Sequence, residues 1–180
     1  MTGYRRNFIA GGSFFFTVNL ADRRLRLLTE HIDELRSAFR KVRERHPFTI
    51  DAMVVLHDHL HAVWTLPEGD ADFAKRWQLI KSAFSHGLPA GEPISESRAA
   101  RGERGIWQRR YWEHTIRDER DFSRHVDYIH INPVKYGLVT RARDWPFSSF
   151  HRMVKLGVYP EDWAGNVREP ENDGRFGERD

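Results

Sequence analysis

The sequence contains no cysteine, and this absence excludes several kinds of site. Neither a disulfide framework nor a thiolate metal site can form, so a bound metal must be held by histidine, carboxylate or amide ligands. Long apolar runs are also missing, since no stretch approaches the roughly 20 apolar residues that a membrane-spanning helix needs. The first residues, MTGYRRNF, lack the apolar core of a signal peptide. We therefore expect a soluble, cytoplasmic protein.

Charged and aromatic side chains are plentiful. Of the 180 residues, 31% are charged and 39% are hydrophobic, and the chain has 12 Phe and 6 Trp. This length and composition fit one domain with a lean core and a well-solvated surface. We expect a single domain over residues 1–165 and a polar, disordered tail over residues 166–180.

The net charge is only +3, with a sequence pI near 9.4, but the charges are unevenly distributed. Arginines gather in the segments 5–26, 36–45 and 98–110, whereas the segment 161–180 is acidic. Arginine in preference to lysine favours recognition of phosphate. The alternative is an ordinary solvated surface, which is what charge runs usually form.

Hydrophobic periodicity predicts the order β-α-β-β-α-β-α. We expect strands at 13–20, 48–59, 60–66 and 107–116, and helices at 30–45, 72–87 and 117–131, with a short helix within 144–157. This order predicts an α+β fold of the ferredoxin-like or RRM-like class, a split β-α-β sandwich whose antiparallel sheet carries helices on one face. The other face would be free to build a site.

Several boundaries follow from local signals. Thr29 is expected to cap the first helix, and Pro47 to end it. The pair Asn132-Pro133 marks the end of the third helix, with Gly137 as a further stop signal. The segment 87–105 is a long loop rich in Gly, Pro, Ser and Arg, whose length indicates mobility or function.

The stretch HDHLH places three histidines at alternate positions, His57, His59 and His61. Because successive side chains of a strand point to opposite faces, they share one face if the strand is regular. His59 and His61 can then bind one divalent ion between them, with Leu60 in the core and Asp58 on the other face, where it is a poor ligand candidate. The alternative is a set of exposed or hydrogen-bonded histidines, and a His-x-His pair alone is weak support for a metal site.

Other classes of histidine enzyme do not fit. The metallo-β-lactamase pattern His-x-His-x-Asp-His fails whether it starts at His57 or at His59. A metal-dependent amidohydrolase barrel needs a much longer chain, and no HExxH helix is present. The histidines still lack a third ligand and a nucleophile.

The helix expected at 117–131, with Asn132 directly after it, carries further polar side chains. Phe122, Val126 and Ile129 form its apolar stripe. At about 100° per residue, Tyr128 lies about 130° from that stripe, so a core role is not expected for it. Tyr128 shares its polar side with Asp121, His125 and Asn132. A surface tyrosine is the alternative, but Tyr-x-x-x-Asn presents a hydroxyl and an amide oxygen in the same direction.

With these residues, the chain resembles the REP-associated tyrosine transposases, which are single-tyrosine members of the HUH endonucleases. The resemblance covers about residues 4 to 165. It rests, in this order, on YRR…GGSFFFTVNL, VVLHDHLHAVWTLPEGD, IWQRRYWEHTIRDERDFSRHVDYIHINPVKYGLV and DWPFSSFHR. HUH denotes two histidines around a bulky hydrophobic residue, here His59, Leu60 and His61.

The resemblance implies a site and a reaction. His59, His61 and Asn132 would hold Mg²⁺ or Mn²⁺, which polarises a nonbridging oxygen of the scissile phosphate. Tyr128 would attack the phosphorus, giving a 5′-phosphotyrosine link and a free 3′-OH, and reversal by another 3′-OH would rejoin strands. The ordinary tyrosine pKa of about 10 must then be lowered by metal and basic surroundings.

The resemblance also implies a partner, single-stranded DNA with a hairpin of the repetitive extragenic palindrome (REP) type. Phosphate contacts are expected from Arg5, Arg6, Arg109 and Arg110. Base stacking is expected from Trp107, Tyr111 and Trp112, with core packing as an equal alternative for the tryptophans. A monomer is favoured, with a homodimer as the alternative.

Two points stay open at the level of the sequence. The family usually has proline where this chain has His57, which could bind phosphate, supplement the metal or simply be tolerated. A domesticated hairpin-binding protein without turnover is the alternative function, and Tyr111 is a reserve nucleophile. A metal-dependent hydrolase that uses water has no supporting motif. The intact set of His59, His61, Tyr128 and Asn132 favours the enzyme, because a pure binder needs none of them.

Overall fold

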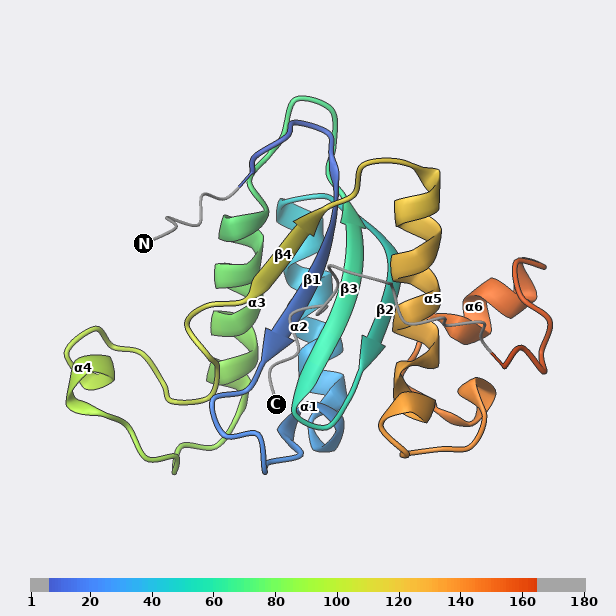
Figure 1. The fold of residues 1–180 in the computed structure, drawn as a ribbon. Coiled ribbons are helices and arrows are strands. Elements are labelled where there is room, and N and C mark those ends of the chain that lie inside the picture. Colours follow the sequence, from blue (N-terminus) through green and yellow to red (C-terminus); the bar gives the residue numbers. More distant parts are fainter. Residues whose placement is uncertain (1–6, 165–180) are drawn as a thin grey trace, which may run out of the picture.

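A four-stranded antiparallel sheet forms the centre of the fold, with the strands in the spatial order β2-β3-β1-β4 (Figure 1). The computed structural model describes residues 7–164. The strands are β1 (Ser13–Asn19), β2 (Thr49–Val55), β3 (His59–Thr65) and β4 (Trp112–Thr115). The strand expected at 48–59 thus ends at Val55, and a turn over residues 56–58 leads into β3.

Helices lie on both sides of this sheet. They are α1 (Leu27–Glu30), α2 (Ile32–Arg45), α3 (Phe73–Gly87), α4 (Glu96–Ala99), α5 (Glu119–Lys135), the 3₁₀ turn η1 (Ala142–Asp144) and α6 (Phe150–Lys155). Figure 1 shows α2 and α3 together on one side of the sheet and α5 beside β2. Between residues 7 and 164, no helix combines the length and apolarity that crossing a membrane requires.

The alternation of side chains along β1 divides the core into two layers. Phe14 and Phe16 pack with the buried residues of α2 and α3. Phe15, on the opposite face, packs with Val126 and Ile129 of α5. Because both faces are covered, the middle of β1 is buried throughout, which explains why three phenylalanines follow one another there.

The predicted α+β class and the antiparallel sheet are confirmed, and α2 and α3 cover one face as expected. The other face is not left open, because α5 lies against β2 and β3. A site on that face is therefore enclosed between the sheet and a helix.

Two helix boundaries differ from the prediction. Thr29 does not cap α2; His31 separates α1 from α2, and the Thr29 hydroxyl lies 2.7 Å from Nδ1 of His57. Pro133 lies inside α5 instead of ending it. The helix stops at Gly137, whose φ of 67° allows the backbone N–H groups of residues 137 and 138 to donate to the carbonyls of residues 134 and 133.

The long loop before β4 is anchored to α3. Arg104 holds it by donating to Glu92 at 2.5 Å and to the carbonyls of Ser85, Leu88 and Pro89. Arg98 donates to two further carbonyls of the loop, and the segment also contains α4. Arg98 and Arg104 therefore stabilise the fold of this loop.

Candidate active site

His59 and His61 form a buried histidine pair on the face of β3 that α5 covers. Their side chains are 1% and 0% exposed, and their ring centroids lie 5.0 Å apart with the planes at 83°. Leu60 points into the core on the opposite face, as predicted. The strand thus places the two imidazoles side by side on one face, as the alternation of side chains along a strand predicted.

In each histidine, the ring nitrogen nearer the backbone, Nδ1, already has a hydrogen-bond partner. Nδ1 of His59 donates to Asp58 at 2.8 Å, and Nδ1 of His61 lies 2.8 Å from the hydroxyl of Thr17, its cross-strand partner on β1. In both rings Nε2 is therefore the nitrogen suited to a metal. Within residues 7–164, Nε2 of His59 is buried and has no hydrogen-bond partner, as expected of an atom prepared for a ligand.

Asp58 has a supporting role that the alternation did not predict. It lies in the turn before β3, so its carboxylate reaches back to the ring of the next residue and also binds Arg23. Partial burial alone would raise the pKa of Asp58, but the hydrogen bonds from His59 and Arg23 hold it at about 2. A charged carboxylate thus orients His59. The position of Asp58 directly before His59 in the sequence was the feature that could have predicted this role.

Tyr128 lies against the histidine pair. Its ring centroid is 5.3 Å from that of His61, and its side chain is only 2% exposed. The polar side of α5 therefore faces the sheet, and the expectation that Tyr128 stays out of the buried interior is wrong. Lys135, two turns further along α5, places its Nζ 4.9 Å from the centroid of the Tyr128 ring.

Asn132 is fully buried on the same side of α5, one turn after Tyr128 and one turn before Tyr136. The ring of Tyr136, which no sequence pattern had marked, lies 5.2 Å from that of His59. Asn132 thus lies on the helix between two tyrosines that touch the two histidines. Two imidazoles and an amide oxygen suit a borderline or hard divalent cation such as Mn²⁺ or Mg²⁺, so the residues fit the implied metal.

His57 does not join the histidine pair, because it lies in the turn and not on the strand. Its Nδ1 is bound to the hydroxyl of Thr29, and its ring stands edge-on to Trp145 at 5.4 Å. Burial and the nearby Arg26 lower its pKa. The condition under which all three histidines would share one face, a regular strand, is therefore not met at His57.

A second cluster of histidine and carboxylate, here named the β4–α5 clamp, lies on the same face of the sheet. It consists of His114, Asp121 and His125, whose ligand atoms lie within 4.8 Å of one another. His114 Nε2 donates to the Asp121 carboxylate at 2.8 Å, and His125 Nδ1 donates to the Asp121 backbone carbonyl at 2.7 Å. The two rings are stacked at 4.6 Å and 16°, so their in-plane lone pairs run side by side and do not converge on one cation.

The predicted DNA contacts lie in several places. Arg5 and Arg6 lie outside the described residues. Arg109 and Arg110 are exposed on the segment before β4, and Arg109 pairs with Glu103 at 2.8 Å. Arg109 is thus already paired with a carboxylate of the preceding loop.

The aromatic residues in and before β4 lie on different faces of the sheet. Trp107 is buried and donates to the Lys81 carbonyl, which confirms its core role. Tyr111 packs with the α2 and α3 layer, on the face opposite the histidines, which argues against its use as the nucleophile. Trp112 lies on the site face and touches Phe15.

Comparison with known proteins gives consistent matches. The family model described as "Transposase IS200 like" matches residues 15–132. The REP-associated tyrosine transposase of Escherichia coli (strain K12) is 52% identical over 169 residues, which is 94% of each chain. A relative from Haemophilus influenzae is 48% identical over 167 residues, 92% of this chain and 95% of its own. A solved structure of a REP-associated tyrosine transposase bound to a REP hairpin has a TM-score of 0.85 and 51% identity, and covers 99% of this chain and 98% of that one.

Proposed function

Because the chain belongs to the IS200-like transposase family and to the REP-associated tyrosine transposases, we propose that it cleaves and rejoins single-stranded DNA at REP-type hairpins. Cleavage would be metal-dependent and would pass through a 5′-phosphotyrosine intermediate with a free 3′-OH. The observation that carries this proposal is the packing of Tyr128 against His61, on the helix side that also holds Asn132. Nucleophile and candidate ligands come from one chain, so a monomer is the proposed working unit.

Tyr128 is the proposed nucleophile. The Tyr128 oxygen forms a bond to phosphorus as the bond from phosphorus to the 3′ oxygen breaks. The phenol gives up one proton and the leaving 3′ oxygen takes up one proton, so a free 3′-OH results. Attack by another 3′-OH on the phosphotyrosine reverses the step and joins strands. Low exposure of Tyr128 limits the access of water, which favours transfer between strands over hydrolysis.

The groups around Tyr128 support this chemistry. Lys135 brings a positive charge to the ring, where it would stabilise the negative charge that develops on the phenol oxygen. Phe15 packs edge-on against Tyr128 and stacks on His61, so it fixes the nucleophile and one ligand relative to each other.

His59, His61 and Asn132 are the proposed metal ligands. A Mg²⁺ or Mn²⁺ ion held there would polarise a nonbridging oxygen of the scissile phosphate. Asp58 and Thr17 hold the two rings through Nδ1, which leaves Nε2 directed to the site. The donor set supports this assignment, and so does the buried Nε2 of His59, which has no hydrogen-bond partner among residues 7–164.

Hairpin DNA is the proposed partner, because the solved relative is described as bound to a REP hairpin. Arg109 and Arg110 are proposed phosphate contacts, since both are exposed.

A covalent-adduct assay tests the proposal. A labelled REP-type hairpin oligonucleotide with a single-stranded flank is incubated with Mn²⁺, and the adduct is separated by denaturing electrophoresis. We expect an adduct with the wild type and none with Tyr128→Phe. Tyr136→Phe is the matched control, because its ring touches His59 and it keeps Tyr128.

Two results would contradict the proposal. Adduct formation by Tyr128→Phe would move the nucleophile to another residue. Tight hairpin binding by the wild type without an adduct, under any divalent ion, would instead support a hairpin-binding protein without turnover.

A further inference from the structure

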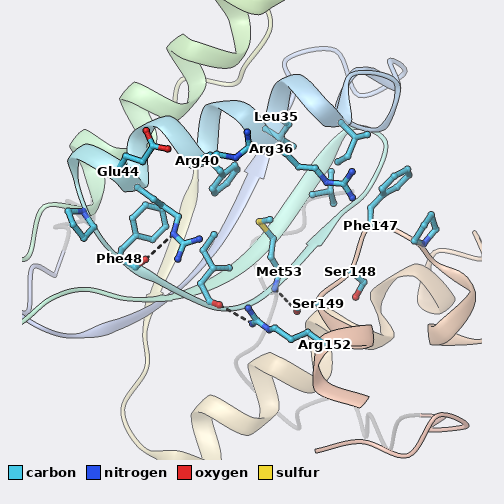
Figure 2. A pocket seen from close by; sticks show the side chains of 17 residues that line it. Leu35, Arg36, Arg40, Glu44, Phe48, Met53, Phe147, Ser148, Ser149 and Arg152 are labelled. Carbon is cyan, nitrogen blue, oxygen red and sulfur yellow. Dashed lines mark hydrogen bonds between the residues drawn. The ribbon is translucent and has the colours of Figure 1, made fainter. Parts of the chain in front are cut away.

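A groove opens between α2, the edge strand β2 and the segment 146–152, and none of its lining residues belongs to the catalytic centre (Figure 2). Its volume is about 640 Å³. Figure 2 shows Arg36 and Arg40 along the helix, Met53 on the strand below them and Phe147 across from the helix.

The floor of the groove is apolar because of the way α2 covers the sheet. Ile50, Met53 and Val55 of β2 point to the same face as the α2 and α3 layer. β2 is an edge strand, and the groove lies along the part of that face next to the edge. Phe147 extends this apolar surface on the far side, where its segment bonds to Val55.

The rim of the groove is positively charged. Four arginines and one glutamate line it: Arg36, Arg40, Arg43, Arg152 and Glu44. Arg152 donates to the carbonyls of Ile50 and Asp51, and Arg43 donates to the carbonyl of Phe48, so both guanidinium groups are held at the rim. The side chain of Arg40 makes no hydrogen bond or ion pair between residues 7 and 164.

The three α2 arginines follow one side of the helix. Residues 36, 40 and 43 are spaced by four and three, so they form a stripe about 10 Å long at a rise of 1.5 Å per residue. Lys41 and Arg45 are also exposed on α2 but do not line the groove. A row of charges above an apolar floor matches a polymer whose anionic backbone runs beside apolar rings.

We propose that this groove binds unpaired nucleotides of single-stranded DNA, with phosphates on the α2 arginines and bases over the apolar floor. The choice of DNA rests on the proposed function, and the groove adds a binding site outside the catalytic centre. Charge complementarity favours a polyanion, and the apolar floor favours one that carries bases over a simple polyphosphate.

The test measures binding in the absence of metal by the full-length Tyr128→Phe protein, so cleavage cannot interfere. The probe is a fluorescein-labelled oligodeoxythymidylate without a hairpin, followed by fluorescence anisotropy. Arg36→Gln/Arg40→Gln removes two charges from the rim. The matched control, Lys41→Gln/Arg45→Gln, removes two charges with the same spacing from the same helix outside the groove.

We expect the rim variant to bind the probe roughly tenfold more weakly than the control. Its salt slope should fall by up to about 1.4, because each arginine that no longer neutralises a single-strand phosphate lowers the slope by about 0.7. Unlabelled oligodeoxythymidylate should displace the probe better than polyphosphate or oligoglutamate of equal charge. Equal losses of affinity in the two variants would overturn the proposal. Equally effective displacement by polyphosphate or oligoglutamate would also overturn it, because the groove would then accept any acidic polymer.

The adduct assay separates this proposal from the proposed function. If the wild type forms the adduct but rim and control variants bind alike, only the groove proposal fails. If only the rim variant loses binding and the wild type forms no adduct, the proposed catalytic function fails and the groove proposal stands.

Discussion

The histidine pair and the β4–α5 clamp lie on the same face of the sheet, and both combine imidazole with a carboxylate. In the histidine pair, Asp58 and Thr17 bind the two Nδ1 atoms. Nε2 of His59 is buried without a hydrogen-bond partner between residues 7 and 164. In the clamp, the histidines donate to Asp121 itself. The two clusters therefore use similar residues differently: the clamp's stacked histidines both donate to Asp121, whereas the histidine pair keeps the buried Nε2 of His59 without a partner among the described residues.

Removing one histidine from each cluster should separate the two most clearly. We expect His61→Ala to weaken Mn²⁺ binding more than 100-fold, beyond the range seen for residues that only support a ligand. His114→Ala should leave Mn²⁺ affinity unchanged, because its Nε2 is used by Asp121. Isothermal titration calorimetry measures both affinities, and a comparable loss in His114→Ala would show that the clamp also binds the ion.

In the proposed site Asp58 would orient a ligand without binding the ion itself, so its removal should have a smaller effect. We expect Asp58→Asn to weaken Mn²⁺ binding about 10- to 100-fold, because His59 loses its charged hydrogen-bond partner. Asp121→Asn is the control, with the same chemical change in the clamp. If the two variants lose equal affinity, the proposed orienting role of Asp58 would be ruled out.

We expect the β4–α5 clamp to affect the pH dependence of stability and not the affinity for metal. Burial lowers the pKa of His125 to about 4, against 6.5 for an exposed histidine. The unfolded chain therefore binds this proton first, so the stabilising effect is complete above pH 6.5 and is lost as the pH falls toward 4. We expect roughly 1–3 kcal/mol of unfolding free energy to be lost over that window through this group.

Urea unfolding of the wild type and of His125→Gln at pH 7 and pH 4.5 measures this loss. The variant should lose less stability between the two pH values, because it lacks the titrating ring. An identical loss in both proteins would mean that other groups govern the acid sensitivity.

Sequence patterns predicted part of the site well, and the failures have physical causes. The alternation along β3 placed His59, Leu60 and His61 correctly, because the strand is regular there. The same alternation failed for His57 and Asp58, because a turn interrupts it. A period of two carries no information about where a strand ends.

The burial of α5 was predicted less well for a different reason. Amphipathicity assigns polar residues to solvent, but Tyr128 and Asn132 face a polar site within the protein. Thr17 was missed because its contact with His61 depends on the pairing of β1 with β3, which the sequence does not state. Functional helices can therefore bury the side that periodicity marks as exposed.

The weakest of the predicted effects concerns His57, the histidine outside both clusters. Its hydrogen bond to Thr29 joins the β2–β3 turn to α1 and is partly exposed to solvent. We expect His57→Ala to lower the unfolding free energy by about 0.5–1.5 kcal/mol, the usual net value of one hydrogen bond. Thr29→Val should cost a similar amount, and the double variant little more, because both changes remove the same bond. Mn²⁺ affinity should stay at the wild-type value in all three proteins, whereas a fall in His57→Ala alone would bring this third imidazole into the metal site.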